Sequence, residues 1–157
     1  MTDLAFTLRG PRPSEADLDA CEARLGVPIP PAYRRFLAEV CNGGAPARAV
    51  AFPVPTRDGG DDEPDLHGLL GVGHPLRYYD IEDAWATFRE AFRDQVLPFG
   101  FDTASGQVCL HLRRDPPGAV SYWDWRTQDP DDPLASLHPV APDLDAFLAL
   151  LRPSLDW

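Results

Sequence analysis

The stretch EARLGVPIPPAYRRFLAEVCNGG, residues 22–44, determines how the first part of this chain folds. It ends one helix, because Gly26 favours the left-handed conformation of a helix C-terminus and the prolines from Pro28 onward lack amide donors. Pro31 suits the first turn of a second helix. The apolar residues of that helix recur at helical spacing: Tyr33, Phe36, Leu37 and Val40. The Asn-Gly-Gly run that follows predicts its end.

A helix is also predicted upstream, over residues 14–25. Ser14 followed three residues later by Asp17 resembles a capping box, which satisfies amide groups at a helix N-terminus. Behind it, one apolar stripe recurs at spacings of three and four: Leu18, Cys21 and Leu25. We expect this helix and the helix after the prolines to pack as a pair.

Two short strands separated by a loop are predicted downstream of the glycines. Apolar residues alternate with smaller ones over 50–54, but Pro53 would restrict this strand to a sheet edge or a bulge. Residues 55–65, PTRDGGDDEPD, are typical of a polar surface loop. The apolar, glycine-containing run at 66–73 predicts a short buried strand.

Two further helices are predicted. Asp80 suits an N-cap, and the helical spacing of the apolar residues behind it extends to about Phe92. A last helix is expected near 142–151, where four apolar residues share one face: Leu144, Phe147, Leu148 and Leu151.

Between these helices the hydrophobic period changes from 3.6 to 2. Alternating segments at 97–101, 107–112 and 119–126, separated by turn residues, predict a three-stranded antiparallel meander. A second acidic loop follows at 128–133. The order of helices, strands, helix, meander and helix favours an α+β fold with about four helices over a parallel βαβ sheet.

Charge and length limit the possible functions. The 157 residues suit a single domain, 1–157, with its core at about 14–152. Acidic residues number 25 against 14 basic ones, a formal charge of -11, which disfavours contact with phosphate backbones. The same charge would attract basic proteins.

The cysteines and the hydropathy pattern favour a reduced, cytoplasmic protein. Cys21, Cys41 and Cys109 form no CxxC pair and lie among apolar neighbours, so we expect buried free thiols. No segment resembles a leader peptide or approaches the ~20 apolar residues of a membrane span.

Catalytic and metal-binding sets are not evident. The four histidines are scattered: His67, His74, His111 and His138. Cys109 and His111 would share one face of a strand, but a nucleophile and its base also need an orienting group. We therefore interpret Cys109 as a core residue beside a histidine that is hydrogen-bonded or exposed. The alternative is a hydrolase that uses His111 and a nearby carboxylate. We therefore expect no enzyme, no catalytic residue, no metal and no cofactor.

The best candidate site is a partner-binding surface near the end of the meander. In a continuous strand, Trp123 and Trp125 would face the core, while Tyr122, Asp124 and Arg126 line an open face. The hypothesis joins that face to the two acidic loops. It comprises Asp58, Asp61, Asp62, Glu63, Asp65, Tyr122, Asp124, Arg126, Asp129, Asp131 and Asp132.

Several motifs together resemble the SUKH superfamily, also called the Smi/Knr cell-wall-assembly regulator domain. The first is the run at 22–44, with its helix, glycine, proline step, Tyr-centred helix and Asn-Gly stop. The resemblance continues over about 14–152 through Leu69-Leu70-Gly71, the helix of Trp85, LPFGFDTASGQVCLHL, VSYWDW and Asp145-Ala146-Phe147-Leu148. The acidic loops at 55–65 and 128–133 depart from the family pattern.

This resemblance implies a domain that bacteria use as immunity proteins against polymorphic or contact-dependent toxins, and fungi as part of a signalling regulator. The shared residues are mainly structural, so no catalytic set is implied. We therefore expect a non-catalytic domain that binds and neutralises a basic toxin domain. An intracellular regulatory or scaffold domain with an endogenous protein partner is the alternative. The sequence does not determine the oligomeric state.

Overall fold

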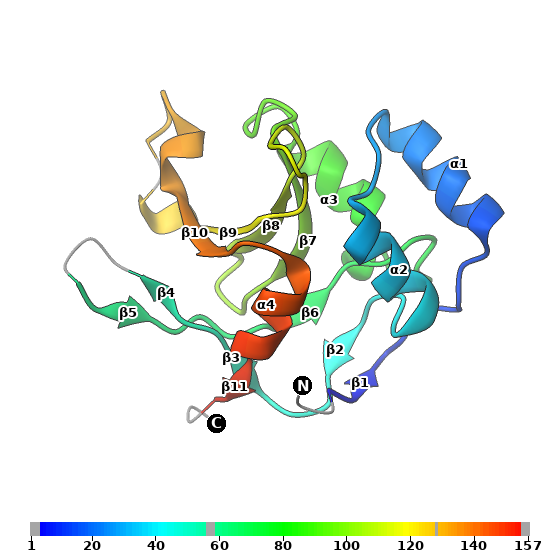
Figure 1. Ribbon diagram of the computed structural model, residues 1–157, viewed down its shortest axis with the longest axis horizontal. Coiled ribbons are helices and arrows are strands. Elements are labelled where there is room, and N and C mark those ends of the chain that lie inside the picture. Colours follow the sequence, from blue (N-terminus) through cyan, green and yellow to red (C-terminus); the bar gives the residue numbers. More distant parts are fainter. Residues whose placement is uncertain (1–3, 56–58, 128, 155–157) are drawn as a thin grey trace.

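An antiparallel sheet of five strands lies at the centre of the structure, in the order β10-β9-β8-β7-β6 (Figure 1). This computed structural model describes residues 4–55, 59–127 and 129–154. The strands are β6 (Gly68–Leu69), β7 (Val96–Phe101), β8 (Gln107–His111), β9 (Val120–Trp123) and β10 (Leu137–Ala141). Strands β7, β8 and β9 are the predicted meander. The α+β class predicted from the sequence is confirmed.

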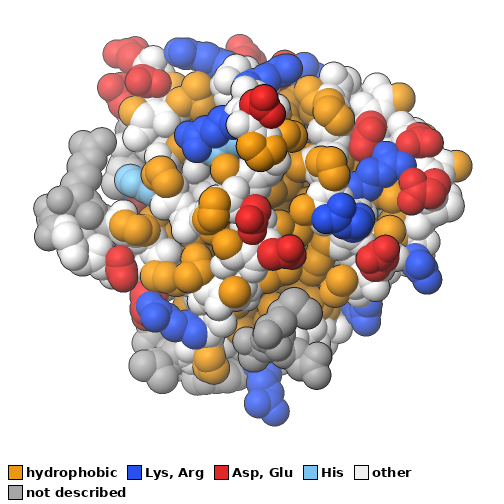
Figure 2. All heavy atoms as spheres, viewed as in Figure 1, with side chains coloured by type: hydrophobic (Ala, Val, Ile, Leu, Met, Phe, Trp, Pro, Cys, Tyr) orange, Lys and Arg blue, Asp and Glu red, His pale blue; other side chains and the backbone are white. Residues whose placement is uncertain are grey.

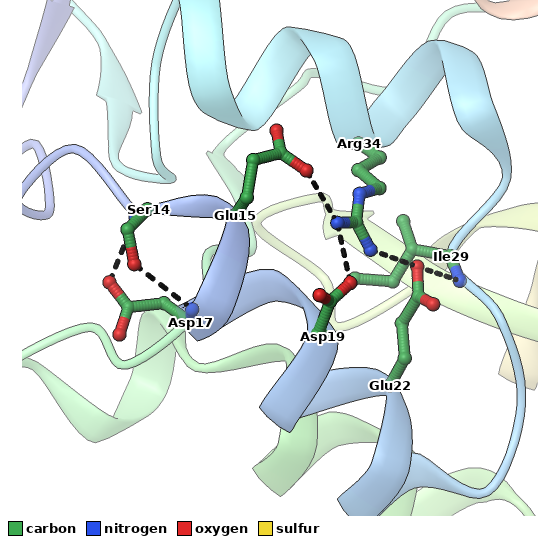
Figure 3. Close-up of polar contacts among 7 residues, drawn as sticks. All are labelled: Ser14, Glu15, Asp17, Asp19, Glu22, Ile29 and Arg34. Carbon is green, nitrogen blue, oxygen red and sulfur yellow. Dashed lines mark hydrogen bonds and ion pairs between the residues drawn. The ribbon is translucent and has the colours of Figure 1, made fainter.

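Four helices are described around this sheet: α1 (Glu15–Leu25), α2 (Pro31–Glu39), α3 (Ile81–Phe88) and α4 (Leu144–Leu150). The predicted capping box begins α1, since the amide of Asp17 donates to Ser14 Oγ and the amide of Ser14 donates to Asp17 Oδ2 (Figure 3). Gly26 ends α1 with a φ of 77°, a value that favours glycine. These local sequence signals therefore locate both ends of α1.

One arginine joins α1 to α2. Arg34 of α2 donates from Nη2 to Glu15 and to Asp19, each at 2.7 Å, and from Nη1 to Glu22 at 2.9 Å (Figure 3). Glu22 also accepts the amide of Ile29 in the proline segment. The predicted pairing of the two helices is thus made by ion pairs, while α1 packs against α3 and α2 against α4.

Three small two-stranded sheets connect the outer segments. They pair β1 (Phe6–Thr7) with β2 (Ala45–Pro46), β3 (Val50–Ala51) with β11 (Arg152–Pro153), and β4 (Val54–Pro55) with β5 (Asp61–Asp62). The strand predicted over 50–54 is interrupted at Pro53, which lies between β3 and β4 and lacks the amide that a continuous strand would need. The predicted polar loop at 55–65 therefore forms part of a hairpin, β4–β5, which projects from one end of the molecule (Figure 1).

The core lies on both faces of the central sheet. On one face, three aromatic rings meet: Phe99 lies 5.0 Å from Tyr33 of α2 and 5.7 Å from Phe147 of α4 between ring centroids. On the other face, Phe92 and Trp123 pack 5.3 Å apart in a smaller cluster. Because both faces are covered, every residue of β8 and β9 is buried.

The three cysteines are free and buried, as expected. Burial raises the pKa of the Cys21 thiol to about 12. Burial also raises the pKa of Cys109, which lies in the smaller cluster beside Trp123. These thiols therefore serve as small apolar core groups.

Several predicted helix boundaries are wrong by a few residues. Helix α3 ends at Phe88 and not near Phe92, because turns replace the helix over residues 89–94, and Phe92 is buried within that turn segment. Helix α4 begins at Leu144, since Asp143 is the N-cap and accepts the amide of Ala146 at 2.8 Å. Val40 is 46% exposed and does not extend the buried stripe of α2.

The strand predicted over 119–126 ends at Trp123. Asp124 Oδ1 accepts the amide of Arg126, two residues further on, and this side-chain bond turns the chain into a short 3-10 segment, η2 (Trp125–Thr127). After the second acidic loop come another 3-10 segment, η3 (Pro133–Ser136), and the edge strand β10, which the sequence did not predict.

Candidate functional site

A groove of about 700 Å³ lies between the β4–β5 hairpin segment and the turn that joins β7 to β8. Residues far apart in the sequence contribute its lining: Ala49, Asp62, Glu63, Pro64, Asp65, His67, Asp102, Thr103, Ala104, Tyr122, Arg126 and Ser154. We call this hollow the acidic groove.

The hairpin segment supplies one wall. Val54 is buried and pairs with Asp62, so the apolar residue holds β4 in place while β5 stays exposed. Glu63 forms an ion pair with Arg152 of β11. Asp65 accepts the amide of Thr103 at 3.0 Å and its hydroxyl at 2.5 Å. The ion pair joins the hairpin segment to β11, and the two Asp65 bonds fasten it to the β7–β8 turn.

The floor of the groove is a buried hydrogen-bonded pair. Asp102 accepts the amide of Gly106 at 2.7 Å and the hydroxyl of Tyr122. A Cβ on Gly106 would lie 2.2 Å from the Tyr122 hydroxyl oxygen, so only glycine leaves room for this contact. Burial, together with the bond to Asp102, raises the pKa of Tyr122. Tyr122 therefore stays protonated and acts as a fixed donor.

The far wall is formed by the residues after β9. Arg126 Nε donates to Asp124 Oδ1 at 2.9 Å, and this bond raises the pKa of Arg126. Asp124 is buried, whereas the Arg126 side chain is 54% exposed. Trp125 is 46% exposed, and its indole Nε1 donates to the carbonyl of Ala104. The wall thus carries a paired cation, Arg126, and the exposed ring of Trp125 lies next to it in the chain.

The structure brings together about half of the residues predicted from the sequence. Five line the acidic groove: Asp62, Glu63, Asp65, Tyr122 and Arg126. Asp124 joins them through its ion pair with Arg126, and Asp61 is exposed on β5 next to Asp62. Asp58 lies outside the described residues.

The described residues of the second acidic loop, 129–133, are not among those that line this groove. Asp129 and Asp132 form a local bridge, and the amide of Asp131 donates to Asp129 Oδ1 at 2.9 Å. All three are exposed. These three residues form a turn that leads into η3. None of them is among the residues that line the acidic groove.

The predicted orientation of the aromatic residues is wrong. Tyr122 is 3% exposed and packs with the core against Phe52, so it forms the buried floor of the groove and is not part of an exposed face. Trp123 is buried as expected, but Trp125 is exposed. The alternation fails because the strand ends before Asp124.

The sequence did not predict the contribution of the β7–β8 turn. Asp102, Thr103 and Ala104 all line the groove. An aspartate at the start of a turn often accepts hydrogen bonds from the amides of that turn, so the role of Asp102 could have been predicted from the sequence. No local pattern relates Thr103 to Asp65, because 38 residues separate them.

Among the residues that the structure describes, the remaining titratable groups do not converge on an accessible reactive centre. His111 Nε2 lies 2.8 Å from Ser121 Oγ, but both residues are buried in the sheet, so a substrate could not reach them. In the described ranges no three His, Cys, Asp or Glu side chains are grouped as metal ligands. His67 Nδ1 lies 3.9 Å from Asp65 at the exposed edge of the acidic groove.

A second groove, of about 300 Å³, lies between α2 and α4 and is mostly apolar. Figure 2 shows hydrophobic side chains gathered over the middle of the molecule in this view, with acidic side chains among them. Glu39 and Val40 lie on this groove. They provide control positions away from the acidic groove.

The fold and the groove define an acidic α+β domain with a carboxylate-lined surface. The chain belongs to the SMI1/KNR4 family (SUKH-1), whose model matches residues 12–150. This match confirms the resemblance seen in the sequence. No curated protein and no solved structure matches the chain. Within the described part of the chain, no helix is both long and apolar enough to cross a membrane.

Proposed function

We propose that this protein is an immunity protein that binds a basic toxin domain through the acidic groove and neutralises it without chemistry of its own. SUKH domains are commonly immunity proteins. The observation that carries the proposal is the groove, where side chains from the hairpin, the β7–β8 turn and the end of β9 converge.

The charge of the groove suits a cationic partner. Its carboxylates are Asp62, Glu63, Asp65, Asp102 and, through Arg126, Asp124. They exceed the guanidinium groups that contact them, Arg126 and Arg152. Together with the net charge of -11, this excess would steer a basic protein toward the groove and raise its association rate.

The exposed ion pair at the groove, Glu63–Arg152, could be exchanged for contacts with a partner. Arg152 and Glu63 are each about half exposed, and so is Arg126. Exposed ion pairs contribute only about 0–1 kcal/mol, so a partner cation could replace Arg152 beside Glu63 at little cost. The Glu63 carboxylate would then bind the partner. Asp124 is buried, so its pair with Arg126 would stay in place.

Toxins that act on nucleic acids present basic surfaces, because Lys and Arg neutralise phosphates. Carboxylates bound across such a surface would occupy the groups that hold the substrate. Neutralisation by this route is stoichiometric and needs no reactive group. Since exposed charge pairs are screened within about 10 Å at 0.1 M salt and about 3 Å at 1 M, binding should weaken with salt.

The test is capture from lysate and secreted fraction of the source cell with three immobilised proteins. They are the native chain, a groove variant (Asp61→Asn, Asp62→Asn) and a control variant (Glu39→Gln, Glu90→Gln) that changes the charge equally at exposed positions outside the acidic groove. We expect the native and control chains to retain one basic protein that elutes with salt, and the groove variant to lose it.

Capture of the same partner by all three proteins would contradict the role of the groove. Recovery of a housekeeping complex by all three would instead favour the regulatory or scaffold function. Binding that does not change between 0.05 M and 1 M salt would contradict the electrostatic part of the proposal.

A further inference from the structure

Exposed aromatic rings surround the β7–β8 turn, next to the acidic groove. Trp125 is 46% exposed and Tyr78 is 60% exposed, whereas the other aromatic residues of the described chain are buried or half-buried. Folding usually buries such rings or leaves them for a partner, and tryptophan, tyrosine and arginine dominate the binding energy of protein interfaces.

Trp125 is held in a fixed orientation on one side of the turn. Its Nε1 donates to the carbonyl of Ala104, a residue that lines the acidic groove. The neighbouring residues in the chain, Asp124 and Arg126, form the ion pair of the groove wall. The indole is therefore oriented before any partner arrives.

A second aromatic surface lies on the other side of the same turn. Tyr78 contacts Phe101 at 5.3 Å between ring centroids, and Phe101 contacts His67 at 5.7 Å. These rings line a groove of about 490 Å³. Gly68 supports them, because a Cβ there would lie 2.5 Å from the Phe101 ring. The surface is thus backed by close packing.

The two grooves meet at the turn. His67, Asp102 and Thr103 line both of them. Carboxylates therefore lie next to both aromatic surfaces: Asp80 and Asp83 of the α3 N-terminal region line the groove of about 490 Å³ beside Tyr78, where Asp83 pairs with the exposed Arg77. An aromatic face beside carboxylates suits one kind of group, a cation with a flat face that can stack on a ring.

We propose that Trp125 and Tyr78 are the anchor residues of the partner interface and that each stacks against an arginine side chain of a basic partner segment. Arginine is favoured over lysine because its planar guanidinium stacks on rings and pairs with carboxylates at the same time. This inference rests on the proposed function, and it adds the residues and the side-chain chemistry that determine specificity.

The test measures binding of octa-arginine and octa-lysine peptides at 0.05 M salt by titration calorimetry and tryptophan fluorescence. The proteins are the native chain, Trp125→Ala, Trp125→Phe, Tyr78→Ala and a matched control, Val40→Ala, whose residue is also 46% exposed. Thermal unfolding verifies that each variant is folded. The fluorescence difference between the native chain and Trp125→Phe reports on Trp125 alone.

The native chain should bind octa-arginine more tightly than octa-lysine, with a change in Trp125 emission. Trp125→Ala and Tyr78→Ala should each bind octa-arginine at least about fivefold more weakly and lose the preference for arginine. Trp125→Phe should retain part of the affinity, and Val40→Ala should match the native chain.

The failures are distinguishable. Equal affinity of the native chain, Trp125→Ala and Tyr78→Ala for octa-arginine would overturn this inference and leave the proposed function in place. Absence of binding by the native chain to either peptide would overturn the inference together with the electrostatic basis of the proposed function.

Discussion

The Tyr122 hydroxyl donates a hydrogen bond to Asp102 across the floor of the acidic groove, and both residues are buried. The bond fixes the β7–β8 turn against β9. Tyr122→Phe removes the donor and leaves one oxygen of a buried carboxylate without this partner, so it should lower the free energy of unfolding by about 1–3 kcal/mol. Urea unfolding would measure the loss. A change below about 0.5 kcal/mol would show that the pair does not fix the turn.

Arg34 contacts three carboxylates of α1, and its side chain is 21% exposed. Arg34→Met should destabilise the fold by about 1–2 kcal/mol at low salt, because the carboxylates then repel one another without a shared cation. Arg35→Met is the matched control, since Arg35 is exposed on the same helix. An equal effect of both variants, or an Arg34→Met effect that is unchanged in 1 M salt, would contradict this role.

His111 makes the stability of the fold depend on pH. Burial, and secondarily the charge of Arg114, lowers its pKa from 6.5 to about 4. Between these pH values the unfolded chain binds more protons than the folded one, so stability is full above pH 6.5 and falls as the pH drops toward 4. The contribution amounts to about 3 kcal/mol at most.

His111→Gln should flatten this acid dependence. Urea midpoints of the native chain and the variant, measured between pH 7 and pH 5, separate the histidine from carboxylates that titrate at lower pH. We expect the native midpoint to fall over this range and the variant midpoint to fall less. Parallel curves would show that His111 is not the group responsible.

Asn42 connects three segments of the fold through its side-chain amide. Nδ2 donates to the carbonyls of Pro11 and Val72, and Oδ1 accepts the amide of Val72 at 2.7 Å. Asn42→Ala leaves buried backbone groups without partners, so it should cost about 3 kcal/mol. Chemical unfolding measures this cost, with the exposed Val40→Ala as the control. A similar small loss in both variants would contradict the connecting role.

The two helices in the first third of the fold, α1 and α2, could be predicted because their signals are local, whereas the small β1–β2 sheet was not predicted. The capping box at Ser14, the left-handed Gly26 and the helix start at Pro31 each depend on neighbours within a few residues. Strand β10 could not be predicted in this way. It is a half-buried edge strand with Pro139 in it, so it shows neither clear alternation nor strand propensity.

The candidate site was predictable only in part. The sequence gives the carboxylates of the hairpin segment and the residues after β9, but their convergence depends on tertiary contacts such as that between Asp65 and Thr103. Alternation extended past Asp124 predicts that Trp125 faces the core, but the Asp124 side chain turns the backbone there. The hydrogen bond from the Arg126 amide to Asp124 therefore explains why Trp125 is exposed and not in the core.

The most direct test of the central claim is a growth measurement. The basic protein captured by the native chain is expressed in a host cell, alone or with the native chain, the groove variant (Asp61→Asn, Asp62→Asn) or the control variant (Glu39→Gln, Glu90→Gln). We predict that the captured protein alone stops growth, that the native and control chains restore it, and that the groove variant restores it poorly. Normal growth with the captured protein alone, or full rescue by the groove variant, would contradict the account.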